Sequence, residues 1–244
     1  MLNILQTEFI KLKRKWIVLF ALLTSTVPPL ITTLYTLNLP KGSSINAKFT
    51  DFYQFTFTEW VLLPIVLGMI ASMIFFDERE NCTLKQIMIV PVNKALFIFS
   101  KFIILLLFSI LFMLLNAVFT ILGAFILGYP DITIALILRL FSLCLQTGFL
   151  TTFAIFPIVA IVVIAKKGYI MPTCASLIYS ISGLILSSNL VGVHPLSSVA
   201  GIIWNKNIEG IKLSANLTSC ILNITIVDAI SIAVSIYSLK MQDF

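Results

Sequence analysis

The apolar residues of this chain gather in six long stretches, and short polar segments separate them. An α-helix rises about 1.5 Å per residue, so about 20 apolar residues cross the hydrocarbon core of a bilayer, which is about 30 Å thick. The pattern therefore predicts an all-α membrane protein of one domain, residues 1–244. Its six transmembrane helices are expected over residues 16–37, 58–76, 97–127, 132–165, 169–190 and 217–239.

The first 15 residues have the pattern of a helix that lies on a membrane surface. Its apolar side is formed by Leu2, Leu5, Phe9 and Leu12. Such a helix buries its apolar face at the boundary between headgroups and acyl chains. In the first span that follows, Pro28 and Pro29 are expected to produce a kink, because proline lacks a backbone donor. Residues 38–57 are expected to form a polar loop.

The longest polar interruption near the middle of the chain covers residues 77–101. Within it, Leu84, Ile87 and Met88 recur at i, i+3 and i+4, which predicts one apolar stripe on a short helix. Pro91 is expected to end that helix, because proline disfavours helical backbone in the residue before it. A short charged helix between two spans suits a surface that another protein grips. A solvated loop whose lysines anchor the spans fits the same pattern.

Lysine and arginine residues predict the orientation, since cytoplasmic segments of membrane proteins carry an excess of them. With the amino terminus inside, eleven of the sixteen basic residues lie on the inner side and five on the outer side. The outer five are Lys41, Lys48, Arg139, Lys206 and Lys212. Both termini are therefore expected in the cytoplasm, on the same side as residues 77–101.

Composition excludes several classes of function. The chain is 59% hydrophobic and 11% charged, with a mean hydropathy of +1.09, whereas soluble domains carry about 25% charged residues. The net charge of +6 comes from basic residues beside apolar stretches, and it does not indicate nucleic-acid binding. The chain has no G-x-x-x-x-G-K-[ST] motif for holding ATP, and a single histidine excludes a multi-histidine metal site. We expect no cofactor on this chain and no enzymatic activity.

Few polar side chains fall inside the predicted spans, and the candidates for function are Asp228, Asn116 and Arg139. Asp228 lies about halfway along the last span, where a bare carboxylate costs several kcal/mol. One interpretation is a functional group that lines a wet internal path or pairs with a basic residue. The other is a protonated or hydrogen-bonded contact between helices.

The segment at residues 191–216 contains an amphipathic pattern after His194 and Pro195. One face of the predicted helix is formed by Leu196, Val199, Ala200, Ile203 and Trp204. This helix is expected to lie flat on the outer surface or to dip into the outer leaflet. A surface helix and a substrate contact through His194 and Trp204 both fit the pattern.

The charged segment carries a recognisable motif. It reads Glu78-Arg79-Glu80-Asn81-Cys82-Thr83-Leu84-Lys85, followed by Pro91-Val92 and Ser100-Lys101. This resembles the first cytoplasmic loop of type-2 ABC exporter permeases, with an acidic residue, Gly-Thr-Leu, Pro-Val or Pro-Ile, and a basic residue. Cys82 departs from the usual glycine, which affects the local turn. By size and loop pattern, the chain is most similar to the lantibiotic-immunity and bacitracin-resistance permeases.

The resemblance implies the transmembrane subunit of an ATP-driven exporter in a bacterial plasma membrane. ATP and magnesium would be bound by a separate dimer of ATPase subunits. A second permease, identical or homologous, would complete the assembly within membrane lipid. The residues that couple to the ATPase would be Glu78, Glu80, Thr83, Leu84, Lys85, Ile87 and Met88.

The implied cargo is an amphipathic peptide antibiotic, moved out of the membrane for self-immunity or resistance. Two alternatives remain open. One is an ABC exporter of lipid or polysaccharide. The other belongs to a different class and is a single-chain secondary transporter that uses Asp228.

Overall fold

A computed structural model of the chain describes residues 6, 9–12, 15–39, 48–57, 62–80, 94–165, 168–185, 190–207 and 216–241. The regular structure of these residues is entirely helical, so the predicted all-α class is confirmed. The elements are α2 (Trp16–Leu23), η1 (Thr24–Thr26), α3 (Val27–Leu37), α4 (Phe49–Phe57), α5 (Leu62–Glu80), α7 (Lys94–Leu127), α8 (Ile134–Ala154), α9 (Phe156–Ile164), α10 (Ile170–Ile185), α11 (Pro195–Asn207) and α12 (Leu217–Met241).

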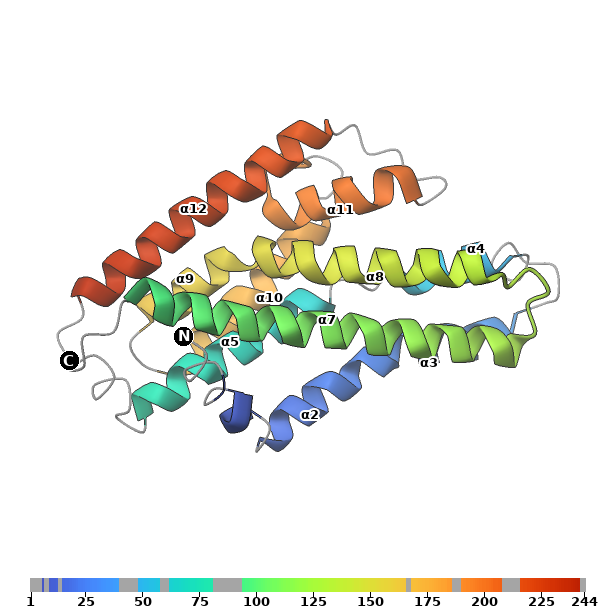
Figure 1. Cartoon of the computed structure of the whole chain (residues 1–244), viewed down its shortest axis with the longest axis horizontal. Helices are drawn as coiled ribbons and strands as arrows, with labels where there is room; N and C mark the ends of the chain where they lie inside the picture. The colour runs from blue at the N-terminus through green and yellow to red at the C-terminus, as the bar shows by residue number, and fades with distance from the viewer. Residues whose placement is uncertain are drawn as a thin grey trace.

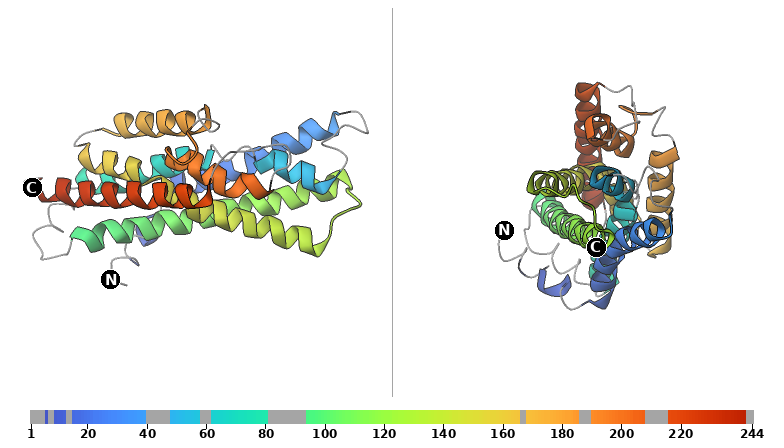
Figure 2. Two further views of the ribbon diagram at one scale, coloured as in Figure 1. Left: turned by 90° about the horizontal axis from the view of Figure 1, so that it is seen from above. Right: turned by 90° about the vertical axis from the view of Figure 1, so that its right-hand side faces the viewer.

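The helices form an elongated bundle in which α7 and α8 lie side by side along the long axis (Figure 1). α5 ends, α7 begins and α12 ends toward the same end of the bundle, on the left in Figure 1. α10 lies at the edge of the bundle in both views of Figure 2. Residues 81–93 connect α5 to α7 and lie outside the described part of the chain.

Four helical segments are long and apolar enough to cross a membrane. They are Trp16–Leu37, Ala95–Leu127, Ile134–Ile164 and Leu217–Met241. They correspond to the first, third, fourth and sixth predicted spans. At the second and fifth predicted spans the structure has α5 and α10. The last turn of α5 is charged and α10 has 16 residues, and neither is among the four helical segments above. A protein with several membrane helices is therefore confirmed, while the count of six stays a prediction.

The first span is interrupted where the sequence predicts a kink. The 3-10 turn η1 separates α2 from α3 just before Pro28 and Pro29. In a regular α-helix the carbonyl of Ser25 would accept from the backbone N–H of residue 29, which proline lacks. The buried side chain of Asn116 on α7 donates to that carbonyl at 3.2 Å. A polar residue of a neighbouring helix thus donates the hydrogen bond that the Ser25 carbonyl cannot receive from Pro29.

The fourth predicted span is two helices rather than one, because α8 ends before Ile155 and α9 begins at Phe156. Pro157 stands in the first turn of α9 and cannot continue the ladder of hydrogen bonds. The N–H of Ile158 donates to Ile155 at 2.9 Å, one residue short of its α-helical acceptor, Ala154. The Tyr179 hydroxyl on α10 donates to the Ala154 carbonyl at 2.6 Å. Again a side chain from another helix donates a hydrogen bond to a backbone carbonyl at the break.

The expectation of a polar loop over residues 38–57 was wrong for its second half, which forms α4. Phe49, Phe52 and Tyr53 of α4 are buried in the core. The carboxylate of Asp131, in the turn between α7 and α8, accepts the backbone N–H of Phe49 at 3.0 and 3.1 Å. A backbone N–H in the first turn of α4 therefore finds its hydrogen-bond acceptor in a residue that is distant in sequence.

Small residues allow close contacts between helices at two places. Ser109 on α7 donates to the carbonyl of Gly148 on α8 at 2.8 Å. A Cβ atom at Gly68 on α5 would overlap with the Cβ atom of Ser176 on α10. Such residues let backbones approach where lipid provides no hydrophobic drive between helices.

Candidate functional site at the charged end of α5

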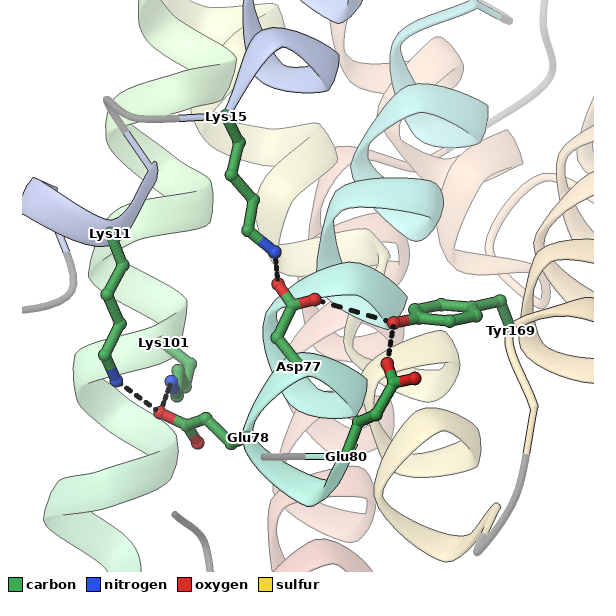
Figure 3. Close-up of polar contacts among 7 residues, drawn as sticks. All are labelled: Lys11, Lys15, Asp77, Glu78, Glu80, Lys101 and Tyr169. Carbon is green, nitrogen blue, oxygen red and sulfur yellow. Dashed lines mark hydrogen bonds and ion pairs between the residues drawn. The ribbon is translucent and has the colours of Figure 1, made fainter. Parts of the chain in front are cut away.

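The last turn of α5 contains four charged residues, Asp77, Glu78, Arg79 and Glu80, which the sequence pattern assigned to a polar interruption. The structure corrects that assignment, because these residues are helical and contact several other elements. We call the group the charged junction. It consists of Arg79 and the residues drawn in Figure 3, which are Lys11, Lys15, Asp77, Glu78, Glu80, Lys101 and Tyr169.

The centre of the charged junction is an ion pair between α5 and α7. Lys101 Nζ lies 2.5 Å from Glu78 Oε1, and the side chains are 1% and 3% exposed. Lys101 Nζ also lies 5.1 Å from the ring centroid of Phe97, within the range of a cation–π contact. Removing one member of a buried ion pair typically costs about 3–5 kcal/mol, because the other charge remains buried. The pair therefore ties the end of α5 to the first turns of α7, on either side of residues 81–93.

Two lysines of the amino-terminal segment contact the same turn of α5. Lys11 Nζ lies 3.1 Å from Glu78 Oε1, the oxygen that Lys101 also contacts, and Lys15 pairs with Asp77. Figure 3 shows both lysines reaching toward α5 from the amino-terminal segment. Their side chains are partly exposed, so each pair adds at most about 1 kcal/mol. Their role is to place the amino-terminal segment beside α5.

Arg79 and Tyr169 join α5 to the α9–α10 connection. The Arg79 guanidinium donates to the Val163 carbonyl at 2.6 Å and to the Ala165 carbonyl. These carbonyls belong to the last turn of α9 and to the residue after it, where helices have no backbone donors of their own. A cation is also favoured there by the helix dipole.

The Tyr169 hydroxyl lies 3.2 Å from Glu80 Oε2 and 3.5 Å from Asp77 Oδ1 (Figure 3). Its single proton can serve one of these carboxylates at a time. Together with Arg79, it connects α5 to the segment that leads into α10. The charged junction thus unites the amino-terminal segment, α5, α7, α9 and the start of α10 at one end of the bundle.

The predicted ATPase-coupling residues are placed only in part. Glu78 and Glu80 stand in the last turn of α5, where Glu78 is buried and Glu80 is exposed. Glu78 pairs with Lys11 and Lys101 in the charged junction. Thr83, Leu84, Lys85, Ile87 and Met88 lie outside the described residues. The coupling role of all seven stays a prediction.

The intramembrane candidates do not gather at the charged junction. Asn116 serves the Ser25 carbonyl, and Arg139 is exposed on α8. Asp228 is buried on α12 at 6% exposure, and its Oδ1 atom has no hydrogen-bond partner. Among the residues that the structure describes, no group of three or more His, Cys, Asp or Glu side chains could hold a metal ion.

The predicted helix after Pro195 is present as α11, but it does not lie flat on a surface. Its apolar face, including Trp204, is buried against α8, α10 and α12. His194 is half-buried, its ring lies 4.5 Å from that of Tyr179, and burial lowers its pKa below the usual range. Asn223 of α12 donates to the Val193 carbonyl at 2.7 Å. It therefore holds the turn before α11.

Sequence reasoning missed the roles of Lys11, Lys15, Arg79, Lys101, Tyr169 and Asn223. One signal was available for Lys101, which is surrounded by apolar residues in the sequence FIFSKFII. A lysine in such surroundings is rarely buried unless it is paired. No comparable local signal identifies the others, because each acts through a partner that is distant in sequence.

Comparison with known proteins agrees with these observations. The sequence model of a family described as ABC-2 family transporter protein matches residues 4–183, well over half of the 244-residue chain. The matched region includes the charged junction and every element from α2 to most of α10. No curated protein matches the chain.

Proposed function

Since the chain belongs to the ABC-2 family of transporters, and is thus the membrane subunit of an ABC transporter, we propose that it works as an exporter permease driven by a separate ATPase. ATP and magnesium are bound by that partner, as a dimer of ATPase subunits, and a second permease completes the membrane part. In this proposal the chain spans a bacterial plasma membrane six times, with both termini in the cytoplasm.

One observation carries the proposed coupling. The buried pair of Glu78 and Lys101 braces both helices that flank residues 81–93. Arg79 and Tyr169 extend the same brace to the α9–α10 connection. In this proposal, a force that an ATPase applies to residues 81–93 reaches α5, α7 and the α9–α10 connection through these polar contacts. This supports the proposal that residues 81–93 are the contact for the ATPase.

The proposed contact has an apolar centre and a polar rim. Leu84, Ile87 and Met88 share one helical stripe in the sequence, while Lys85 and Glu80 lie beside it. Binding energy concentrates in buried apolar anchors, and charges at the rim contribute less. Leu84→Asp should therefore abolish copurification of the ATPase from mild detergent, because it places a charge in a desolvated pocket.

Lys85→Ala is the matched control, and it should retain most of the bound ATPase. Both variants are compared at equal expression and equal membrane insertion. Full retention of the ATPase by Leu84→Asp would contradict the proposed contact. It would favour the alternative in which these residues form a solvated loop.

The proposed cargo is an amphipathic peptide antibiotic. It is supported by the size and loop pattern of the chain, which are similar to those of permeases of the lantibiotic-immunity and bacitracin-resistance group. The test is the susceptibility of cells that express the chain with its ATPase, measured against lantibiotics and bacitracin. Protection that depends on ATP hydrolysis by the partner supports this cargo. Unchanged susceptibility, with altered membrane lipid or surface polysaccharide, favours the alternative exporter.

A further inference from the structure

Asp228 lies in a part of the bundle that provides few hydrogen-bond donors or cations to stabilise an ionised carboxylate. It belongs to the buried face of α12, and its side chain is 6% exposed. The Oδ1 atom is enclosed and accepts no hydrogen bond. No ion pair among the described residues includes Asp228. An isolated carboxylate in such surroundings is so costly that the group takes up a proton instead.

The helices beside Asp228 contribute few donors. α12 packs closely along α9, whose residues Phe156–Ile164 are all apolar. On α12 itself, the hydroxyls of Thr225 and Ser235 donate to the backbone carbonyls of Leu222 and Ser231. The protons of Thr225 and Ser235 are therefore not available to the carboxyl group, and the hydroxyl of the buried Ser231, three residues after Asp228, makes no hydrogen bond to Oδ1.

Tyr179 of α10 is a polar group that interacts electrostatically with Asp228. Its hydroxyl carries one proton, and that proton is donated to the Ala154 carbonyl at the break between α8 and α9. The Tyr179 proton is thus engaged at the break between α8 and α9, and Tyr179 donates no hydrogen bond to Asp228 Oδ1.

The helices that pack against α12 carry other titratable groups. The elements packed against it are α7, α8, α9 and α11. Their titratable and charged side chains, with those of α12 and the residue before α11, are Lys94, Lys101, Arg139, Cys144, His194, Lys206, Cys220, Tyr237 and Lys240. Lys101 is engaged with Glu78 at the charged junction. His194 contacts Tyr179 and Ser182.

We propose that Asp228 is a proton-binding site, and that the bundle in this conformation holds its carboxyl group as a neutral acid. The ligand of the site is a proton. Its release requires a rearrangement that brings water, a cation or the Tyr179 proton to Oδ1. This site is separate from the charged junction, and it does not depend on the identity of the cargo.

The protonation state can be measured directly by infrared spectroscopy of the purified full-length chain in lipid at neutral pH. A neutral carboxylic acid and an ionised carboxylate have separate carbonyl bands, and the acid band shifts in deuterated water. The difference spectrum of wild type minus Asp228→Asn should contain an acid band. If this difference spectrum contains carboxylate bands and no acid band, the proposal is wrong.

Asp131→Asn is the matched control. Asp131 accepts the Phe49 N–H through both carboxylate oxygens, so its difference spectrum should contain carboxylate bands. If Asp228→Asn does not fold, Asp228→Ser replaces it. If neither folds, the wild-type chain is titrated alone, since it has only ten acidic residues. An acid band that persists at neutral pH supports the site, and complete loss of acid bands near the usual carboxyl pKa of about 4 overturns it.

Discussion

Lys101 and Glu78 are 23 positions apart in sequence and form an ion pair of 2.5 Å in which both side chains are buried. The pair joins the last turn of α5 to the first turns of α7, and Lys11 contacts the same carboxylate oxygen. Neither side chain of the pair reaches solvent, so removing one leaves the other charge buried without that partner. This relationship leads to the first prediction.

Lys101→Met should destabilise the protein by about 3 kcal/mol, because Glu78 would stay buried without its closest cation. Lys11 keeps one contact to Glu78, which places the expected loss at the low end of the range for buried pairs. The measurement is the free energy of unfolding of the purified chain in detergent.

The double variant Lys101→Met, Glu78→Leu is the control for that experiment. Replacing both members of a buried pair by apolar side chains is often close to neutral. The double variant should therefore recover most of the lost stability. A double variant that is as unstable as Lys101→Met would show that the lysine acts through packing and not through the pair.

Asn116→Ala should cost about 1–3 kcal/mol, because it leaves the Ser25 carbonyl buried without a donor. Adding Pro29→Ala restores a backbone N–H four residues after Ser25. The asparagine would then no longer be needed, and its replacement should cost less in the Pro29→Ala background. Unfolding measurements on the four chains of this cycle give the coupling. Equal costs in both backgrounds would contradict the assigned role of Asn116.

Gly68→Ala should destabilise the contact between α5 and α10 by about 1–3 kcal/mol, since the new Cβ atom overlaps with Ser176. Ser176→Gly removes the overlapping atoms, so the double variant should regain stability. The readout is the melting temperature in detergent. If Gly68→Ala lowers the melting temperature equally in the wild-type and Ser176→Gly backgrounds, the overlap with Ser176 is not the cause.

The proposed orientation is tested by cysteine labelling in intact cells. After the four native cysteines are replaced by serine, an impermeant reagent should reach Ser43→Cys and Lys206→Cys but not Lys167→Cys. The physical basis is the excess of lysine and arginine on the inner side. Labelling of Lys167→Cys from outside would reverse the orientation.

The isolated chain should hydrolyse no ATP, because it has no phosphate-binding loop. The purified chain is assayed alone and with its copurified ATPase. Activity confined to the complex supports the division of labour between the two subunits. Sustained turnover by the chain alone would contradict it.

Several features of the site could be predicted locally and others could not. The charged segment and the helix after Pro195 were both visible as patterns of one element, while the apolar stripe at Leu84, Ile87 and Met88 lies outside the described residues and stays a prediction. α4 was overlooked although Phe49, Phe52 and Tyr53 have helical spacing, because the polar residues around them suggested a loop. The partners of Lys101, Asn116 and Tyr179 could not be predicted, since each is set by the packing of two or more helices.

The sequence by itself determined that this protein is helical and lies in a membrane, because its long apolar stretches can satisfy their backbone groups in lipid only as helices. Its prolines also determined where the first and fourth spans are interrupted. Only the tertiary structure decided which side chains satisfy the carbonyls at those interruptions, which charges pair at the end of α5, and that the buried Oδ1 atom of Asp228 has no hydrogen-bond partner. These outcomes depend on the distances between helices, and one-dimensional periodicity carries no information about which faces meet.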